Sequence, residues 1–288
     1  LSPVSAQNFD SIYYRKSIIT AFKEAGFQTA FFSNQRYNHS FIDFFGMEAD
    51  TYDFIKEDSQ DSQYNPSDDE LLMLVEKELE KGNRKQFIVL HTYGSHFNYR
   101  ERYPETAAFF LPDFPVDAEV KYKDNLMNAY DNSIRYTDNF LARIIHLLKQ
   151  QQVDASMLYT SDHGEDIFDD GRHLFLHASP IPSYYQLHVP LLLWTSDSYR
   201  EEYPGIEKAA SMNRQKNISS SISFFQTMME LAGIETPYRN DSLSVTSPLY
   251  TEKSRVYLND HNEPHSLDDI GMRKEDFEML KKRGIDAQ

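Results

Sequence analysis

The sequence has 288 residues with 45 acidic and 29 basic side chains, which gives a formal net charge of −16 and argues against nucleic-acid binding through phosphate contacts. The absence of cysteine excludes disulfides, thiolate metal ligands and a cysteine nucleophile. A hydrophobic content of 40% and an aromatic content of 14% indicate a folded globular protein with a substantial core.

The first half of the chain is predicted to alternate helices and strands. Apolar side chains recur at helical spacing over 13–25, before Gly26, and a strand follows at 27–35. A helix is predicted over 68–82, with Ser67 and Glu70 expected to form a capping box at its start. A buried strand over 87–96 then ends in "HTYGSH". Residues 104–119, which contain three prolines, are expected to cross the surface.

The second half continues this alternation. It predicts a long helix from Val120 to Gln151, and then strands over 156–164 and 188–196, a helix over 218–233, a strand over 254–260 and a peripheral helix in the polar tail. The pattern predicts an α/β protein with a mainly parallel central sheet and helices on both faces. The apolar run "VPLLLW" suits a strand that is buried on both sides. No segment resembles a linker, so we expect a single domain over 1–288.

Polar side chains gather where the predicted strands end. Asp162 and His163 follow one strand, and His91 and His96 lie at and just beyond the end of another. A third group, Ser33, Asn34 and Gln35, follows the strand at 27–35. Ligands of open α/β sheets bind beyond the carboxyl ends of the strands, so these segments could converge on one site.

The Asp162-His163 pair offers a carboxylate oxygen and an imidazole nitrogen, a ligand set that suits Zn²⁺ and, less well, Mn²⁺. Gly164 would let the backbone turn sharply directly after the pair. Glu165 could accept a hydrogen bond from a His and orient it. Taken alone, the pair is more typical of a solvated acidic loop that caps the next helix than of a metal site.

His177 strengthens the interpretation as a metal site, because it places a second imidazole at the end of the loop that begins with Asp162 and His163. His96 lies in "GSH", where Gly94 would permit close approach of the backbone to an anion. Together with His91, these residues predict a site for a metal ion and a phosphate group.

Four nearby residues carry weaker signals. His173 could simply belong to the loop, and His188 could hydrogen-bond at the start of a strand. Arg100 and Arg102 could bind a phosphate group. Exposed arginines on a loop usually have no such specific role.

These motifs carry a family resemblance. "SDHGE", "LHASP" and "HVPLLLW" are similar to motifs of the alkaline phosphatase and sulfatase superfamily. "HTYGSHFNYRERYP" resembles, more narrowly, the phosphoethanolamine transferases that modify lipid A and the core sugars of lipopolysaccharide. The resemblance covers most of residues 12–237.

The resemblance implies a bacterial inner-membrane enzyme whose catalytic domain faces the periplasm. It implies that Asp162 and His163 hold Zn²⁺, that His96 and His177 bind the donor phosphate or a second zinc ion, and that His91 is a further active-site residue. The expected substrates are a phospholipid donor and a lipopolysaccharide acceptor, with transfer through a phospho-Thr intermediate.

The chain departs from this family at its start, because the family's nucleophilic Thr and a ligand Glu would precede the segment "LSPVSAQNFD". We therefore expect a piece of a longer protein that lacks the membrane anchor and the nucleophile, binds metal weakly and has little or no activity. Thr20, Thr29 and Thr160 are poor substitutes, since they fall in a helix, in a strand and directly before the metal pair. A sulfatase or phosphodiesterase, a phosphoglycerol transferase and a non-catalytic binding domain of the same fold remain alternatives.

Overall fold

The computed structural model describes residues 16–36, 42–56, 65–82, 85–177, 181–258 and 264–285. The helix predicted over 13–25 begins at Ile18 instead, because Ser17 caps its first turn, and the predicted positions 13–15 lie outside the described residues. The chain divides into two compact units, Lys16–Gln152 and a second one that includes Val153–Gln288, and each is described by itself. The expectation of a single domain stays a prediction. Among the described helices, none has the length and apolar character needed to span a bilayer.

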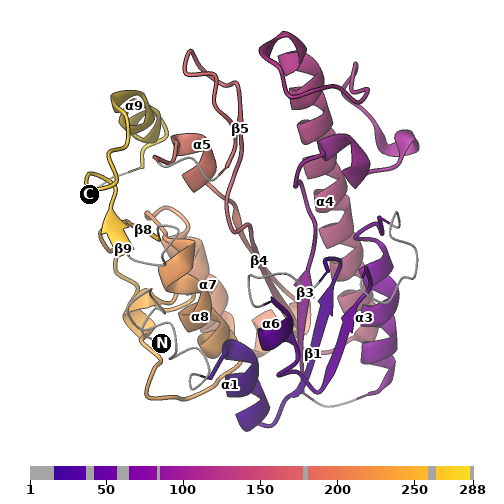
Figure 1. Ribbon diagram of the computed structural model, residues 1–288. Coiled ribbons are helices and arrows are strands. Elements are labelled where there is room, and N and C mark those ends of the chain that lie inside the picture. Colours follow the sequence, from indigo (N-terminus) through magenta and orange to yellow (C-terminus); the bar gives the residue numbers. More distant parts are fainter. Residues whose placement is uncertain are drawn as a thin grey trace. The chain divides into compact units, whose positions relative to one another are not determined.

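The unit Lys16–Gln152 is built on a three-stranded parallel sheet with the strand order β2-β1-β3 (Figure 1). Its strands are β1 (Gln28–Ser33), β2 (Thr51–Phe54) and β3 (Gln86–His91). Its helices are α1 (Ile18–Glu24), α2 (Ile42–Gly46), α3 (Glu70–Glu80) and α4 (Lys123–Gln151). The central strand β1 is almost wholly buried, as expected for a strand with a neighbour on each side. Ser33 pairs with His91, so the carboxyl ends of β1 and β3 lie side by side.

The helix predicted over 68–82 is confirmed as α3, but its predicted start is wrong. Helix α3 begins at Glu70 after Asp69, and no side chain caps its first turn. Ser67 Oγ instead accepts a hydrogen bond from the Asp69 amide at 3.3 Å, so the expected capping box does not form. The Asp69 carboxylate instead bonds to α4, accepting hydrogen bonds from Tyr136 at 2.7 Å and Arg143 at 2.6 Å.

Asp50 ties the start of β1 to its surroundings. Its carboxylate accepts hydrogen bonds from the amide and the hydroxyl of Thr29, both at 2.9 Å, and pairs with Lys23 at 2.8 Å. The hydrogen bond with Lys23 and those from Thr29 hold the pKa of Asp50 below its usual value. A carboxyl whose pKa is lower in the folded state stabilises the fold above its unfolded-state pKa, and this contribution is lost as the pH falls through the folded-state value.

We therefore expect Asp50→Ala to lower the free energy of unfolding by about 1–2 kcal/mol at pH 7. The deficit should shrink towards zero below pH ~3.9, the ordinary pKa of Asp. Denaturant unfolding of the wild type and the variant at pH 7 and pH 3 measures this difference. Glu76→Ala, at an exposed position of α3, serves as the control. A deficit that does not change between the two pH values would contradict the assignment.

The unit that includes Val153–Gln288 contains three antiparallel strand pairs. They are β4 (Ser156–Thr160) with β7 (Leu191–Thr195), β5 (Asp166–Ile167) with β6 (Phe175–Leu176), and β8 (Val256–Leu258) with β9 (Pro264–Ser266). Its helices are α5 (Tyr184–Leu187), α6 (Asp197–Glu202), α7 (Pro204–Asn213), α8 (Ser220–Leu231) and α9 (Lys274–Lys282). The predicted strands β4 and β7 are present, and they pair antiparallel. The described residues therefore combine one parallel sheet with separate antiparallel strand pairs, and the α/β class is confirmed.

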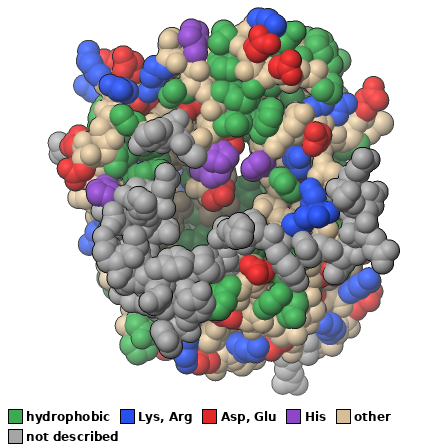
Figure 2. Space-filling view, viewed as in Figure 1, with side chains coloured by type: hydrophobic (Ala, Val, Ile, Leu, Met, Phe, Trp, Pro, Cys, Tyr) green, Lys and Arg blue, Asp and Glu red, His purple; other side chains and the backbone are tan. Residues whose placement is uncertain are grey.

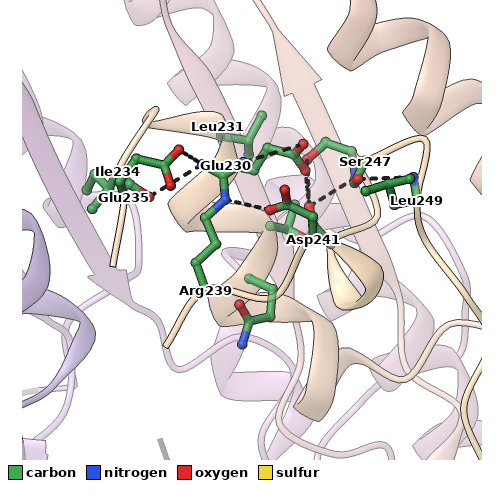
Figure 3. A network of polar contacts seen from close by, with 12 residues as sticks. Glu230, Leu231, Ile234, Glu235, Arg239, Asp241, Ser247 and Leu249 are labelled. Carbon is green, nitrogen blue, oxygen red and sulfur yellow. Dashed lines mark hydrogen bonds and ion pairs between the residues drawn. The ribbon is translucent and has the colours of Figure 1, made fainter. Parts of the chain in front are cut away.

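A polar network fixes the end of α8 to the segment that follows it (Figure 3). Arg239 lies between three carboxylates, at 2.6 Å from Asp241, 3.0 Å from Glu235 and 3.9 Å from Glu230. Glu230 also accepts a hydrogen bond from the Thr246 hydroxyl at 2.8 Å. These side-chain contacts, rather than a long helix or a strand, hold residues 235–249 in place.

Candidate metal centre

Two candidate ligands lie at the two ends of one short hairpin. Strands β5 and β6 pair Asp166 with Leu176, so Glu165 directly before β5 faces His177 directly after β6. The two side chains meet, with 2.9 Å between Glu165 Oε1 and His177 Nδ1. The Glu165 side chain is only 4% exposed. This contact confirms that Glu165 orients a His and identifies that His as His177.

The loop after β4 adds a second imidazole. The rings of His163 and His177 lie 3.9 Å apart between centroids. His163 Nδ1 lies 3.0 Å from the Gly164 carbonyl oxygen. Since a carbonyl only accepts, Nδ1 carries the proton and Nε2 presents its lone pair. Ligand atoms of His163, Glu165 and His177 all lie within 4.8 Å of one another, which fits one metal ion.

Asp162 lies at the edge of this group. Its Oδ2 is 3.6 Å from His163 Nε2, and its side chain is 85% exposed. The structure thus brings two predicted residues, His163 and His177, together around Glu165, whereas Asp162 contacts His163 and is not one of the three residues in this group. It also adds Glu165 itself as a potential ligand. Imidazole and acidic side chains are exposed on the face drawn in Figure 2.

Gly164 has a different role from the sharp turn that the sequence suggested. A Cβ atom at this position would lie 2.1 Å from the carbonyl oxygen of Tyr185. The Gly164 amide donates to the Gln186 carbonyl oxygen at 2.8 Å. Glycine is therefore needed because the backbone next to the metal pair packs directly on the backbone of α5.

Contacts between Asp166 and the segment that contains helix α5 hold the hairpin in place. Asp166 is 2% exposed and accepts hydrogen bonds from Ser183 at 2.7 Å and from Gln186 at 2.5 Å. Burial raises the pKa of Asp166, and these two hydrogen bonds act against that shift. The neighbour of Glu165 is thus fixed to the same helix that contacts Gly164.

The tip of the hairpin is fixed by α9. Arg172 donates two hydrogen bonds to the Asp276 carboxylate, at 2.7 and 2.8 Å, and is also paired with Asp170 at 2.6 Å. Asp276 is completely buried and accepts a further hydrogen bond from the Tyr184 amide at 2.8 Å. One carboxylate therefore holds both the hairpin and α5. Nothing in the local sequence signalled this contact, because Arg172 and Asp276 are 104 residues apart.

His91 and His96 belong to the unit Lys16–Gln152. His91 ends β3, and its Nδ1 lies 2.9 Å from the Ser33 hydroxyl at the end of β1. The side chain of Gln35 donates to the Thr92 carbonyl oxygen at 3.3 Å. The ends of β1 and β3 are therefore brought together as predicted. That His91 and His96 join the group around Glu165 stays a prediction.

Asp68, which the sequence did not single out, holds the "TYGSH" loop. Its carboxylate accepts hydrogen bonds from the amides of Tyr93 at 2.8 Å and Gly94 at 2.9 Å, and from the side chain of Asn34 at 2.8 Å. The Gly94 amide is thus bonded to the Asp68 carboxylate, and close approach of the backbone here to a bound phosphate stays a prediction. The loop places the Tyr93 and His96 rings 5.4 Å apart, edge to face.

The two arginines after this loop are bonded within the unit. Arg100 donates to the Tyr103 carbonyl oxygen at 3.2 Å and lies 3.4 Å from Asp113. The Arg102 side chain is only 7% exposed and its guanidinium lies 4.2 Å from the centre of the Tyr93 ring. The expectation that both are exposed is wrong, because the Arg100 side chain is also only 20% exposed, and Arg102 supports the loop.

The weaker candidates have local structural roles. His173 lies in the hairpin turn with φ of 54°, and His188 Nδ1 lies 2.7 Å from the Tyr184 hydroxyl. Burial, and then the nearby Arg283 and Arg255, lower the pKa of His188.

Three threonine hydroxyls are held by local acceptors. Thr20 donates to Glu48 at 2.6 Å, Thr29 to Asp50 at 2.9 Å and Thr160 to the Pro190 carbonyl oxygen at 2.9 Å. That none of the three is the nucleophile stays a prediction.

The comparison with protein families matches the sulfatase family over residues 3–234. The phosphoethanolamine transferase EptA of Escherichia coli (strain K12) is 36% identical over 157 residues, which are 52% of this chain and 28% of that protein. The chain thus spans less than a third of the length of this curated relative.

Two solved structures share the fold. The C-terminal periplasmic domain of EptC from Escherichia coli in complex with Zn has a TM-score of 0.75 and 22% identity over 95% of this chain and 77% of that one. The integral membrane lipooligosaccharide phosphoethanolamine transferase A (EptA) from Neisseria meningitidis has a TM-score of 0.71 and 23% identity over 84% of this chain and 46% of that one. At these identities the structures support the fold alone.

Proposed function

Because the chain belongs to the sulfatase family, we propose that it is the catalytic part of a phosphoethanolamine transferase. The intact protein would move phosphoethanolamine from a phospholipid donor to the lipid A or core sugars of lipopolysaccharide. It would be anchored in the bacterial inner membrane, with this part in the periplasm. The similarity to EptA and to the EptC and lipooligosaccharide transferase structures supports this assignment.

The observation that carries the proposal is the meeting of His163, Glu165 and His177 within 4.8 Å. Two imidazoles and a carboxylate, without sulfur, suit Zn²⁺ better than Mn²⁺, which favours oxygen ligands. Glu165 is nearly buried, and a buried carboxylate requires a positive partner. The donor set therefore fits zinc. The neighbouring structure of EptC in complex with Zn supports the same choice.

Asp162 and His163 would hold the ion, with His177 and His96 as further ligands or as donors to the phosphate oxygens. A bound Zn²⁺ would lower the pKa of a nucleophilic hydroxyl and offset charge that develops on the phosphate. The Glu165 carboxylate keeps the His177 ring in place, and the Asp68 carboxylate keeps the loop that carries His96. His91, held by Ser33, would be a further active-site residue.

The transfer would take two displacements at phosphorus. A Thr hydroxyl of the intact protein, upstream of the segment "LSPVSAQNFD", attacks the phosphorus as the bond to the diacylglycerol oxygen breaks, and the diacylglycerol leaves with a proton. An acceptor oxygen then attacks the phospho-Thr and releases the Thr. Donors such as His96 and His177 would stabilise the charge on the phosphate oxygens in both steps.

The proposal is tested on the intact protein with a fluorescent phosphatidylethanolamine. We expect release of the fluorescent diacylglycerol, a phosphorylated Thr when no acceptor is present, and phosphoethanolamine on purified lipid A when it is added. The same protein with Asp162→Ala and His163→Ala should do none of these. Release of free phosphoethanolamine with no modified lipid A would favour a hydrolase of the same fold.

A further inference from the structure

Apolar side chains are exposed together on one loop of the unit Lys16–Gln152. The apolar loop, defined here as residues 106–116, precedes α4 and exposes 65% of Phe109, 68% of Leu111 and 54% of Phe114. Helix α4 adds Met127 at 36% and Ile134 at 45% exposure. Soluble proteins seldom expose large apolar side chains in such a group unless the surface binds something.

Buried hydrogen bonds hold the apolar loop in this shape. Asn132 of α4 is completely buried, and its Oδ1 accepts hydrogen bonds from the amides of Phe109 and Phe110, both at 2.9 Å. Its Nδ2 donates to the Phe110 carbonyl oxygen at 3.0 Å. Asn128 donates to the Pro112 carbonyl oxygen at 2.9 Å. The loop therefore lies against the N-terminal half of α4 (Figure 1), and its backbone cannot rotate to bury the aromatic rings without breaking these bonds.

The exterior of the apolar loop carries no charge. Asp113 is the sole ionisable residue in 106–116, and its side chain is 9% exposed. It accepts a hydrogen bond from the Tyr103 hydroxyl at 2.7 Å and lies 3.4 Å from Arg100 Nε. The net charge of the chain is −16, so a neutral apolar surface is a local exception. This neutrality suits contact with hydrocarbon, where an exposed carboxylate would be costly.

A cation lies at the border of the same surface. The exposed Arg135 of α4 places its guanidinium 4.1 Å from the centre of the Phe109 ring and 5.9 Å from that of Phe110. Aromatic and aliphatic side chains flanked by a basic group are typical of segments that enter the boundary between lipid head groups and acyl chains. The guanidinium would meet the lipid phosphates at that depth.

We propose that the apolar loop docks this unit on a phospholipid bilayer, with Phe109, Leu111 and Phe114 inserted at the head-group boundary. The choice of lipid as the occupant rests on the proposed function, whose donor and acceptor are both membrane lipids, and on the uncharged exterior of the loop.

Insertion can be measured with a tryptophan in the loop. In a Trp194→Phe background, which removes the sole natural tryptophan, Phe114→Trp is compared with Tyr238→Trp, at a 62% exposed position of the other unit. Vesicles of phosphatidylethanolamine and phosphatidylglycerol with brominated acyl chains are the probe. We expect a blue shift and quenching for the tryptophan at 114 and neither for that at 238. Equal behaviour of the two would overturn the proposal.

Vesicle co-sedimentation gives an independent measurement. The triple variant Phe109→Ser, Leu111→Ser, Phe114→Ser should bind the same vesicles at least ten-fold more weakly than the wild type. The matched control Met212→Ser, Leu249→Ser removes side chains that are 60% and 64% exposed elsewhere, and should bind normally. Circular dichroism verifies that both variants fold. Loss of binding in both variants, or in neither, would contradict docking through this loop.

Three further outcomes separate this inference from its alternatives. Self-association that the triple variant abolishes, without any binding to vesicles, would assign the surface to a second copy of the chain. Transfer activity of the intact protein with no vesicle binding through the loop would overturn the docking and leave the function intact. Vesicle binding through the loop without transfer would overturn the function and leave the docking.

Discussion

Replacing His177 by Ala is expected to weaken zinc binding by this chain about 100-fold or more, a loss of the size seen when metal sites lose ligand support. The reason is geometric, since His177 supplies one of the two imidazoles in the cluster and is the contact of Glu165 at 2.9 Å. Without it, the nearly buried Glu165 carboxylate loses that partner as well. Competition with a chromophoric chelator measures the zinc Kd.

His173→Asn is the matched control for this experiment. It removes an imidazole from the same hairpin, and Asn tolerates the positive φ of 54° at that position. The control should bind zinc with the Kd of the wild type. Glu165→Gln keeps the shape of the side chain and removes its charge. Its zinc Kd should lie between those of His173→Asn and His177→Ala. If His173→Asn and His177→Ala weakened binding equally, the cluster would not be the metal centre.

Asp276→Ala is expected to have a comparably large effect although Asp276 lies outside the cluster. Removing one partner of a buried ion pair typically costs about 3–5 kcal/mol, and the loss here should lie at or below the lower end of this range, because Arg172 keeps its pair with Asp170 at 2.6 Å. Arg172 would lose its two hydrogen bonds to the carboxylate, and the hairpin that carries Glu165 and His177 would lose its attachment to α9. Denaturant unfolding should show lower stability, and the zinc Kd of the folded variant should rise.

Controls separate support of the hairpin from a general loss of stability. Glu278→Ala, on the same helix with a 64% exposed side chain, should change neither quantity. The double variant Arg172→Met, Asp276→Leu removes both charges and should recover part of the stability without recovering the zinc affinity. Stability and zinc affinity that stay at wild-type values in Asp276→Ala would show that the hairpin needs no such support.

Sequence patterns predicted the elements with long periodic signals. The helix predicted from Val120 to Gln151 corresponds to α4, preceded by one 3₁₀ turn at Val120–Tyr122. The strands β1, β4 and β7 fall within predicted ranges, and β3 begins one residue before its range, at Gln86, because apolar runs bounded by polar clusters are strong local signals. Their pairing is not local, and the antiparallel contact of β4 with β7 could not be read from either strand.

The short strands and helices were not predicted, for a different reason. Strands β5 and β6 have two residues each, too few for any alternation to be seen. Helices α6 and α7 did have start signals, since Ser196 caps α6 and Pro204 opens α7. Their polar composition, over a stretch rich in charged residues, hid the apolar face.

The sequence predicted the candidate metal ligands better than it predicted the residues that hold those ligands in place. Asp162, His163 and His177 stood out because metal ligands have distinctive residue types, and Glu165 was correctly expected to orient a His. Asp68 and Asp276 were missed because a carboxylate with structural hydrogen bonds has the same letter as a solvated one, and its partners lie far along the chain. Burial depends on tertiary packing, which local sequence does not encode.

The attachment of the hairpin to α9 has a consequence for where the catalytic part of this protein can be cut. The sulfatase match ends at residue 234, whereas Asp276 lies 42 positions beyond it (276 − 234). A truncated protein that stops at the family boundary would keep every candidate zinc ligand and lose the carboxylate that anchors Arg172 and the start of α5. Boundaries chosen from family similarity alone would therefore yield a domain with its ligands present and its ligand hairpin unanchored.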